Sequence, residues 1–347
     1  MTIKVPQCAP LATLQTALAG LDRDETPAHW LDQLVRQGLD QLPKPGSGAT
    51  LQRWQALCAV AEHDLSLAKL YEGHTDALAV IAETAPEAKP VAGATWGMWA
   101  AEPPDGRVVV EATASDGWRL SGTKRWCSGA AQVSHGLVTT WFADGRGPQL
   151  VRVAMDQTGV GVSAEGWHAV GMAASASIDV AFDRAEVERT GNEGAYLDRP
   201  GFWQGGAGIA ACWYGGALTL AGALQRALLQ APPSGRNAFR LAALGKVGVS
   251  LQSTAALLRE AALWIDDHPT QDASASALQV RLAAEGSAKL VLDEAGRALG
   301  ATPYCRDASF AQMAADLPVF LRQSHGERDF VALGERMLSP GGGSWQL

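Results

Sequence analysis

The stretch Gly122-Thr123-Lys124-Arg125-Trp126-Cys127-Ser128-Gly129-Ala130 decides the fold of this 347-residue chain. It reads as a short strand that ends at a glycine and carries a flat aromatic side chain, Trp126, and a hydroxyl, Ser128. Around it, apolar and polar residues alternate as in half-buried strands, within residues 108–113, 149–155 and 177–183. Short strands separated by glycine-containing turns predict a small β-barrel or sandwich.

Helical patterns lie on both sides of these strands. Apolar residues recur at helical spacing in residues 31–39, 54–61, 64–83, 247–265, 274–300 and 317–337. The sequence therefore predicts an α+β fold in three parts with a tail. We expect an N-terminal helical domain (1–91), a middle β domain (92–198), a C-terminal antiparallel helix bundle (199–338) and a flexible tail (339–347).

Composition limits the classes of function. A hydrophobic fraction of 47% with 18% charged residues is typical of a packed globular protein. A net charge of −8 and the lack of a basic run argue against a nucleic-acid partner. We find no secretory leader and no uninterrupted apolar run of membrane-spanning length, so we expect a cytoplasmic protein without a membrane partner.

The five cysteines and seven histidines are scattered along the chain. No cysteine pair has the C-x-x-C spacing, and no two histidines share a helical face as H-x-x-x-H. We therefore expect buried thiols, no disulfide framework and no metal site.

The order of parts resembles the acyl-CoA dehydrogenase family over essentially the whole chain. That family carries, in order, Thr-Glu-Pro, Thr-x-Ala, Asn-Gly-x-Lys, Trp-Ile-Thr or Trp-Ile-Ser, and Gly-Met segments in its β domain. The matching residues here are Ala101-Glu102-Pro103, Ala112-Thr113-Ala114, Ser121-Gly122-Thr123-Lys124, Trp126-Cys127-Ser128 and Gly171-Met172.

The resemblance implies a flavoprotein that binds FAD. Trp126 would cover one face of the flavin ring, and Ser128 would hydrogen-bond its reactive edge. Ala101 and Cys127 lie in the same cofactor-contacting segments, and Arg107 follows the segment that meets the diphosphate. Glu102 and Trp203 are the residues that we expect to line the substrate site. Taken alone, Trp126 and Ser128 are better interpreted as a core aromatic and a strand-end cap, and it is the order of the surrounding motifs that favours the flavin contacts.

Two cofactor motifs of the family are altered. The Gly-Ser expected after Glu102-Pro103 is replaced by Pro104-Asp105-Gly106-Arg107, which has no serine. The family's Arg-x-x-Phe-Gly, which grips the adenine half of FAD, is replaced by Arg236-Asn237-Ala238-Phe239-Arg240.

The catalytic base of the family is a glutamate near the C-terminus. The corresponding region here is residues 323–329, where either His325 or Glu327 could take that role. A histidine with an ordinary pKa near 6.5 is a suitable base. His325 could also be a surface residue beside a solvated charge cluster.

Three functions are compatible with this sequence. The first is oxidation of the α,β bond of an acyl thioester, carried by CoA or a carrier protein, with hydride transfer to flavin. The second is a two-component monooxygenase of the same fold that binds reduced flavin and O2. The third is a catalytically degenerate member that binds an acyl group or a protein partner. The resemblance also implies a homodimer or homotetramer.

Overall fold

The computed structural model describes residues 10–103, 107–114, 117–163, 166–235 and 237–338. The chain forms two compact units. The barrel unit comprises Met1–Lys44 and Ser66–Phe202, and the bundle unit comprises Pro45–Leu65 and Trp203–Leu347. The tail predicted to be flexible, 339–347, lies outside the described residues, and the predicted domain boundaries stay a prediction.

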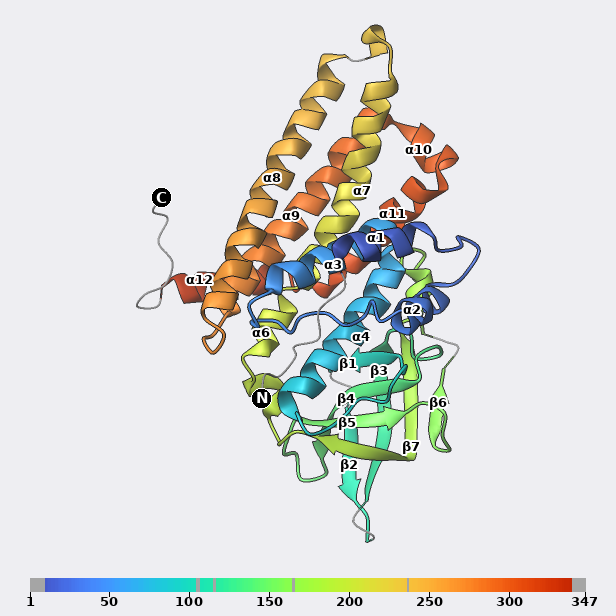
Figure 1. Cartoon of the computed structure of the whole chain (residues 1–347), viewed down its shortest axis with the longest axis vertical. Coiled ribbons are helices and arrows are strands. Elements are labelled where there is room, and N and C mark those ends of the chain that lie inside the picture. The colour runs from blue at the N-terminus through green and yellow to red at the C-terminus, as the bar shows by residue number, and fades with distance from the viewer. Residues whose placement is uncertain (1–9, 104–106, 115–116, 164–165, 236, 339–347) are drawn as a thin grey trace. The chain divides into compact units, whose positions relative to one another are not determined.

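Seven strands build the barrel unit (Figure 1). They are β1 (Trp96–Trp99), β2 (Val108–Ala112), β3 (Trp118–Cys127), β4 (His135–Phe142), β5 (Gln149–Ala154), β6 (Val160–Val162) and β7 (Ile178–Thr190). Pairing runs β4-β2-β3-β7-β5 and returns from β5 to β4, which closes a barrel. β1 lies parallel to β4, and β6 pairs with β7. The predicted small barrel is confirmed.

The described residues of the same unit also form four α-helices, one of which packs against the barrel. They are α1 (Leu11–Ala19), α2 (Pro27–Arg36), α4 (Leu65–Thr84) and α5 (Ala195–Asp198). Val80 and Ile81 of α4 pack against Trp96, Leu137 and Leu150 in one buried apolar cluster. Burial of these side chains supplies the main driving force for docking α4 on the barrel.

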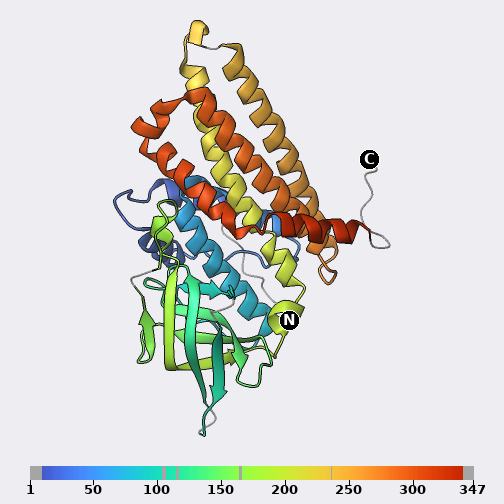
Figure 2. The same ribbon diagram turned by 180° about the vertical axis from the view of Figure 1, so that it is seen from behind.

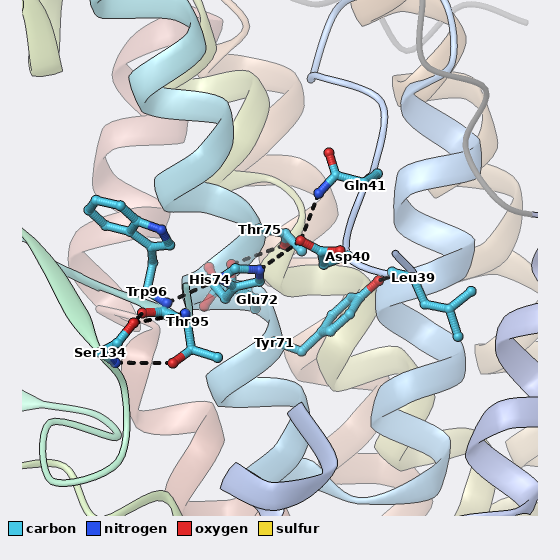
Figure 3. A network of polar contacts seen from close by, with 10 residues as sticks. All are labelled: Leu39, Asp40, Gln41, Tyr71, Glu72, His74, Thr75, Thr95, Trp96 and Ser134. Carbon is cyan, nitrogen blue, oxygen red and sulfur yellow. Dashed lines mark hydrogen bonds and ion pairs between the residues drawn. The ribbon is translucent and has the colours of Figure 1, made fainter. Parts of the chain in front are cut away.

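A buried polar network fixes the start of β1 (Figure 3). The backbone N–H of Trp96 donates to Nδ1 of His74 at 3.1 Å, so Nε2 of His74 carries the proton and donates to Asp40 Oδ2 at 3.1 Å. Asp40 and His74 are both buried. Tyr71 donates to the carbonyl of Leu39 in the same loop. The network ties the loop after α2 to α4 and β1.

Among its described residues, the bundle unit contains helices and connecting loops but no strand. It contains α3 (Thr50–His63), α7 (Ile209–Gln230), α8 (Ala238–Asp267), α9 (Ser274–Leu299), α10 (Ala301–Arg306), α11 (Ala308–Phe320) and α12 (Glu327–Met337), with α6 (Gly201–Gly206) at its entry. α8 runs antiparallel to α7 and α9, and the three helices pack side by side (Figures 1 and 2). Gly215 of α7 lies against the Cys58 carbonyl of α3, an approach that only a residue without Cβ allows.

The helices predicted at 64–83 and 274–300 are confirmed as α4 and α9. The continuous helix predicted over 317–337 is wrong. α11 ends at Phe320, two residues after Pro318, and a 3-10 turn (Leu321–Gln323) follows. Gly326 then adopts a φ of 55°, and α12 begins at Glu327. His325 therefore lies in a loop and not on a helix.

Two helical stretches, Gly201–Gln230 and Ala238–Asp267, are long and apolar enough to cross a membrane by length and composition alone. The most apolar window of the first is 72% buried, as in the core helix of a globular unit. The window in α8 is only 28% buried. Phe239, Val249 and Leu263 of α8 are exposed. α8 therefore presents large apolar side chains to solvent.

Candidate functional site

The end of β3 carries a bulge that turns Trp126 outward. Lys124 pairs with Val180 and Cys127 pairs with Ile178, so two residues of β3 stand opposite one residue of β7. Trp126 has a φ of 58° and is 55% exposed. Because a bulge re-aims the side chain of its extra residue, the indole leaves the barrel wall and offers a face to a ligand.

Two further strained residues lie beside this bulge. Met172 and Ala176 have φ values of 58° and 40° and flank a 3-10 turn, Ala173–Ser175. Together with Trp126 they make up three of the four non-glycine residues that have positive φ in the described part of the chain. Such conformations cost about 1–3 kcal/mol each and gather at functional sites. We call residues 126–128 and 172–177 the Trp126 edge.

A chain of hydroxyls holds Ser128. Ser175 Oγ donates to the Met172 carbonyl at 2.8 Å, and Ser177 Oγ lies 3.2 Å from Ser175 Oγ and 2.7 Å from Ser128 Oγ. Each hydroxyl has one proton, so Ser177 donates to Ser175 and Ser128 donates to Ser177. The Ser128 oxygen is left with lone pairs for a ligand. Trp99 Nε1 donates to the Ser128 carbonyl and fixes the backbone.

Glu102 and Arg107, predicted to contact substrate and cofactor, lie together and are engaged within the barrel unit. Trp141 Nε1 donates to Glu102 at 2.8 Å, and the Arg107 guanidinium lies 4.1 Å above the Trp141 ring. The ammonium of Lys124 lies 3.7 Å from the same carboxylate. Burial lowers the pKa of Lys124, against the opposing effect of Glu102. This cluster joins the end of β1 to β3, which carries Trp126.

The other two predicted cofactor contacts differ in exposure. Ala101 is exposed just after β1. The Cys127 thiol is buried and contacts the Lys124 carbonyl, and burial raises its pKa well above the usual range. Cys127 is therefore an unreactive packing group, in contrast to the exposed Trp126 beside it.

The predicted catalytic region forms a second candidate site, in the bundle unit. Asp329 is buried, and its Oδ1 lies 3.4 Å from His325 Nδ1 while its Oδ2 accepts the His325 backbone N–H at 3.2 Å. Arg281 Nη2 of α9 lies 3.8 Å from Asp329 Oδ2. The His325 side chain is 58% exposed. Glu327 is exposed at the start of α12 and has no ion pair with any described residue.

Trp203 lies in the bundle unit on α6, where it is half-buried. The Arg336 guanidinium of α12 lies 5.6 Å from its ring, two turns beyond Asp329. α12 thus contacts one candidate substrate residue and carries Glu327, with His325 just before its start. Sequence reasoning missed Asp329 as the partner of His325, although the spacing of four residues was a usable signal.

A pocket of about 470 Å³ opens elsewhere on the barrel unit, and none of the predicted site residues lines it. Trp96, Trp118, His135 and Arg152 contribute to its walls. Within the described residues, no group of three or more histidine, cysteine or acidic side chains could hold a metal ion.

Solved structures of FMN-containing enzymes share the fold of this chain. KijD3, in complex with FMN and dTDP-3-amino-2,3,6-trideoxy-4-keto-3-methyl-D-glucose, aligns with a TM-score of 0.76 and 20% identity over 94% of this chain and 90% of KijD3. FMN-bound TdsC from Paenibacillus sp. A11-2 aligns with a TM-score of 0.75 and 20% identity over 97% and 98% of the two chains. TdsC is a dibenzothiophene monooxygenase.

Methanesulfinate monooxygenase MsuC from Pseudomonas fluorescens aligns with a TM-score of 0.75 and 19% identity over 95% of this chain and 97% of MsuC. No protein-family model and no curated protein sequence matches the chain. At these identities the likeness establishes the fold and not the reaction. The chain therefore has the acyl-CoA dehydrogenase-like fold that it shares with these enzymes, of which KijD3 and TdsC have been solved with FMN.

Proposed function

We propose that this chain is a flavin-dependent monooxygenase that binds reduced FMN at the Trp126 edge. The observation that carries the proposal is the exposed indole of Trp126, held outward by a strained bulge beside Ser128. An indole face is a natural stacking surface for a planar ring. Bound FMN would supply the electron transfer and oxygen activation that protein side chains lack.

The altered motifs favour FMN over FAD, the cofactor that the family resemblance implies. FAD needs contacts for a second phosphate and an adenosine. No serine follows Glu102-Pro103, and Arg107 is stacked on Trp141. Phe239, in the segment that replaces Arg-x-x-Phe-Gly, is 88% exposed. FMN has one phosphate and no adenosine, so it requires neither missing motif.

The direction of the serine chain favours the reduced ring. Ser128 donates its proton inward to Ser177 and presents lone pairs outward. Reduced isoalloxazine carries an N–H at N5, whereas the oxidised ring has only an acceptor there. An acceptor hydroxyl therefore complements the reduced form and opposes the oxidised form.

His325 is the proposed proton-transfer group. Its imidazole is exposed and has a carboxylate partner, while Glu327 has none. Oxygen insertion needs no carboxylate to remove a proton beside a thioester carbonyl. Dehydrogenation of an acyl thioester carried by CoA or a carrier protein remains the second candidate, and the unpaired carboxylate of Glu327 is the observation that favours it.

We also propose that the protein forms a homodimer or homotetramer through α8. Its exposed apolar side chains, including Phe239, Val249 and Leu263, exceed what a monomeric helix usually presents to water. Basic Arg240 and Lys246 lie toward its start, and acidic Asp267 lies at its end. Two copies of α8 packed antiparallel would place opposite charges against each other.

The test is a set of titrations of the whole chain with FMN and FAD, each oxidised and, without oxygen, reduced. We expect reduced FMN to bind at least tenfold more tightly than oxidised FMN or either form of FAD. Trp126→Ala should weaken FMN binding about tenfold, the scale of one lost ring stack. Ser177→Ala frees the Ser128 proton and should reduce the preference for the reduced form.

Trp264→Ala is the matched control, because Trp264 of α8 lies in the bundle unit and stacks on His268, which follows the helix. Its FMN affinity should equal that of the unaltered protein. Tighter binding of FAD than FMN, or unchanged FMN affinity in Trp126→Ala, would contradict the proposal. Anaerobic bleaching of bound flavin by an acyl-CoA would support the dehydrogenase instead.

A further inference from the structure

We propose that Asp329 is a positioning residue that holds His325 in one tautomer, with the proton on Nδ1 and the lone pair of Nε2 facing outward. The inference rests on the proposed function insofar as His325 is its proton-transfer group. Both oxygens of Asp329 contact His325, one at the ring Nδ1 (3.4 Å) and one at the backbone N–H (3.2 Å). A carboxylate accepts and does not donate, so a proton on Nδ1 makes this contact attractive, whereas a lone pair there would face the negative charge of Asp329.

The surroundings of Asp329 keep its carboxylate in place. Asp329 is the third residue of α12, where the helix dipole favours a negative charge. Arg281 of α9 adds a positive charge 3.8 Å away, and its guanidinium lies 5.5 Å from the Trp213 ring. The Asp329 side chain is 11% exposed and the His325 side chain 58% exposed. The imidazole therefore turns one nitrogen inward and the other toward solvent.

The backbone around His325 is held by the same helix, α9. Arg281 donates to the Gln323 carbonyl at 3.3 Å. One turn later on α9, the Glu285 carboxylate accepts from the Ser324 hydroxyl, which in turn accepts the Gly326 N–H. Contacts on both sides of His325 restrict the loop, so the ring has few alternatives to its place beside Asp329.

This arrangement sets the direction of proton transfer. The lone pair on Nε2 takes a proton from a substrate O–H: the O–H bond breaks, an N–H bond forms, and the ring becomes a cation. Asp329 stabilises that cation through its contact with Nδ1. No electrons are exchanged, and the proton returns to the substrate or to water when the ring is neutral again. With the opposite tautomer, Nε2 would carry a proton and could not act as a base.

The experiment is ¹⁵N NMR of the histidine rings in the full-length protein, with His325 assigned by the signals lost in His325→Asn. We expect neutral His325 in the unaltered protein to be mostly protonated at Nδ1. Asp329→Asn should shift the population toward the tautomer protonated at Nε2. Asp293→Asn is the control, because Asp293 is an exposed acid of α9 that pairs with Arg297.

A second measurement follows modification of His325 by diethyl pyrocarbonate, read by mass spectrometry. The reagent attacks an unprotonated ring nitrogen, so Asp329→Asn should slow it severalfold and Asp293→Asn should leave it unchanged. If NMR of the unaltered protein shows that most of neutral His325 is protonated at Nε2, the inference is overturned by that result alone. Absence of flavin binding would contradict the proposed function and leave the tautomer result standing, so the two failures are distinguishable.

Discussion

The Trp126 edge and the loop around His325 are built by opposite means. At the Trp126 edge, left-handed backbone at Trp126, Met172 and Ala176 and neutral hydroxyls set the geometry. Around His325, charged side chains of α9 and α12 set it. A rigid, neutral edge suits a planar ring, and a charged loop suits proton transfer. The edge should therefore be sensitive to added volume and the loop to pH.

The largest effect is expected from Gly136→Ala in the barrel unit. A Cβ at Gly136 would collide with the ring of Trp99, which also lies against Gly97 and whose Nε1 donates to the Ser128 carbonyl. Overpacking of this kind costs about 1–3 kcal/mol. Urea denaturation should show that loss, together with weaker FMN binding. Unchanged stability and affinity would show that Trp99 does not support the edge.

The charged loop around His325 is tested by measuring how the stability of Glu285→Gln depends on pH. Hydrogen bonds from Lys289 and Ser324 outweigh burial and hold the pKa of Glu285 below its ordinary value of 4.5. A lowered folded pKa contributes stability above 4.5 that is lost as pH falls through the folded pKa. At pH 7 the substitution should cost about 1–2 kcal/mol. Denaturation at a series of pH values should show this cost shrinking in acid; a constant cost would contradict the assignment.

Trp126→Gly separates stability from function at the edge. Glycine adopts a φ of 58° without strain, whereas the backbone strain of tryptophan at this position costs about 1–3 kcal/mol. The greater conformational freedom of glycine in the unfolded chain cancels part of the stability gained by removing that strain. Stability should rise by about 1 kcal/mol while FMN binding falls as in Trp126→Ala. A less stable variant would mean that the indole is a packing group.

The smallest effect is expected from Gly334→Ala in α12. A Cβ at Gly334 meets only open space, in contrast to Gly136. Replacing an exposed glycine inside a helix by alanine stabilises it by up to about 1 kcal/mol. The same substitution should therefore have opposite signs in the two regions. Thermal denaturation checks this, and a loss of stability would show that Gly334 has a contact the structure lacks.

The elements that could be predicted from the sequence are those that depend on a short-range pattern of apolar and polar residues. Helical spacing located α4 and α9 within a residue or two, and alternation located β2, β5 and the first half of β7. The role of Trp126 in the quoted stretch stays a prediction. Its exposure could not be predicted from the sequence pattern, because the bulge depends on the register between β3 and β7. The prediction of one continuous helix over 317–337 was wrong because Pro318 and Gly326 interrupt the helix despite the helical spacing of apolar residues.

Residues that act through distant partners were also missed. Ser177 orients Ser128 from 49 positions away, and His74 joins Asp40 to β1 across 34 and 22 positions. Such contacts follow from the closed barrel and from the docking of α4, which no local window contains. The roles of Ala101, Glu102 and Arg107 stay predictions from the family resemblance.

The most direct test of the central claim is a crystal structure of the full chain with reduced FMN, obtained without oxygen. The account predicts the isoalloxazine ring stacked on the Trp126 indole with N5 beside the Ser128 hydroxyl. A ring bound elsewhere, for example in the pocket bordered by Trp118 and Arg152, or an indole folded back onto the barrel wall, would contradict it.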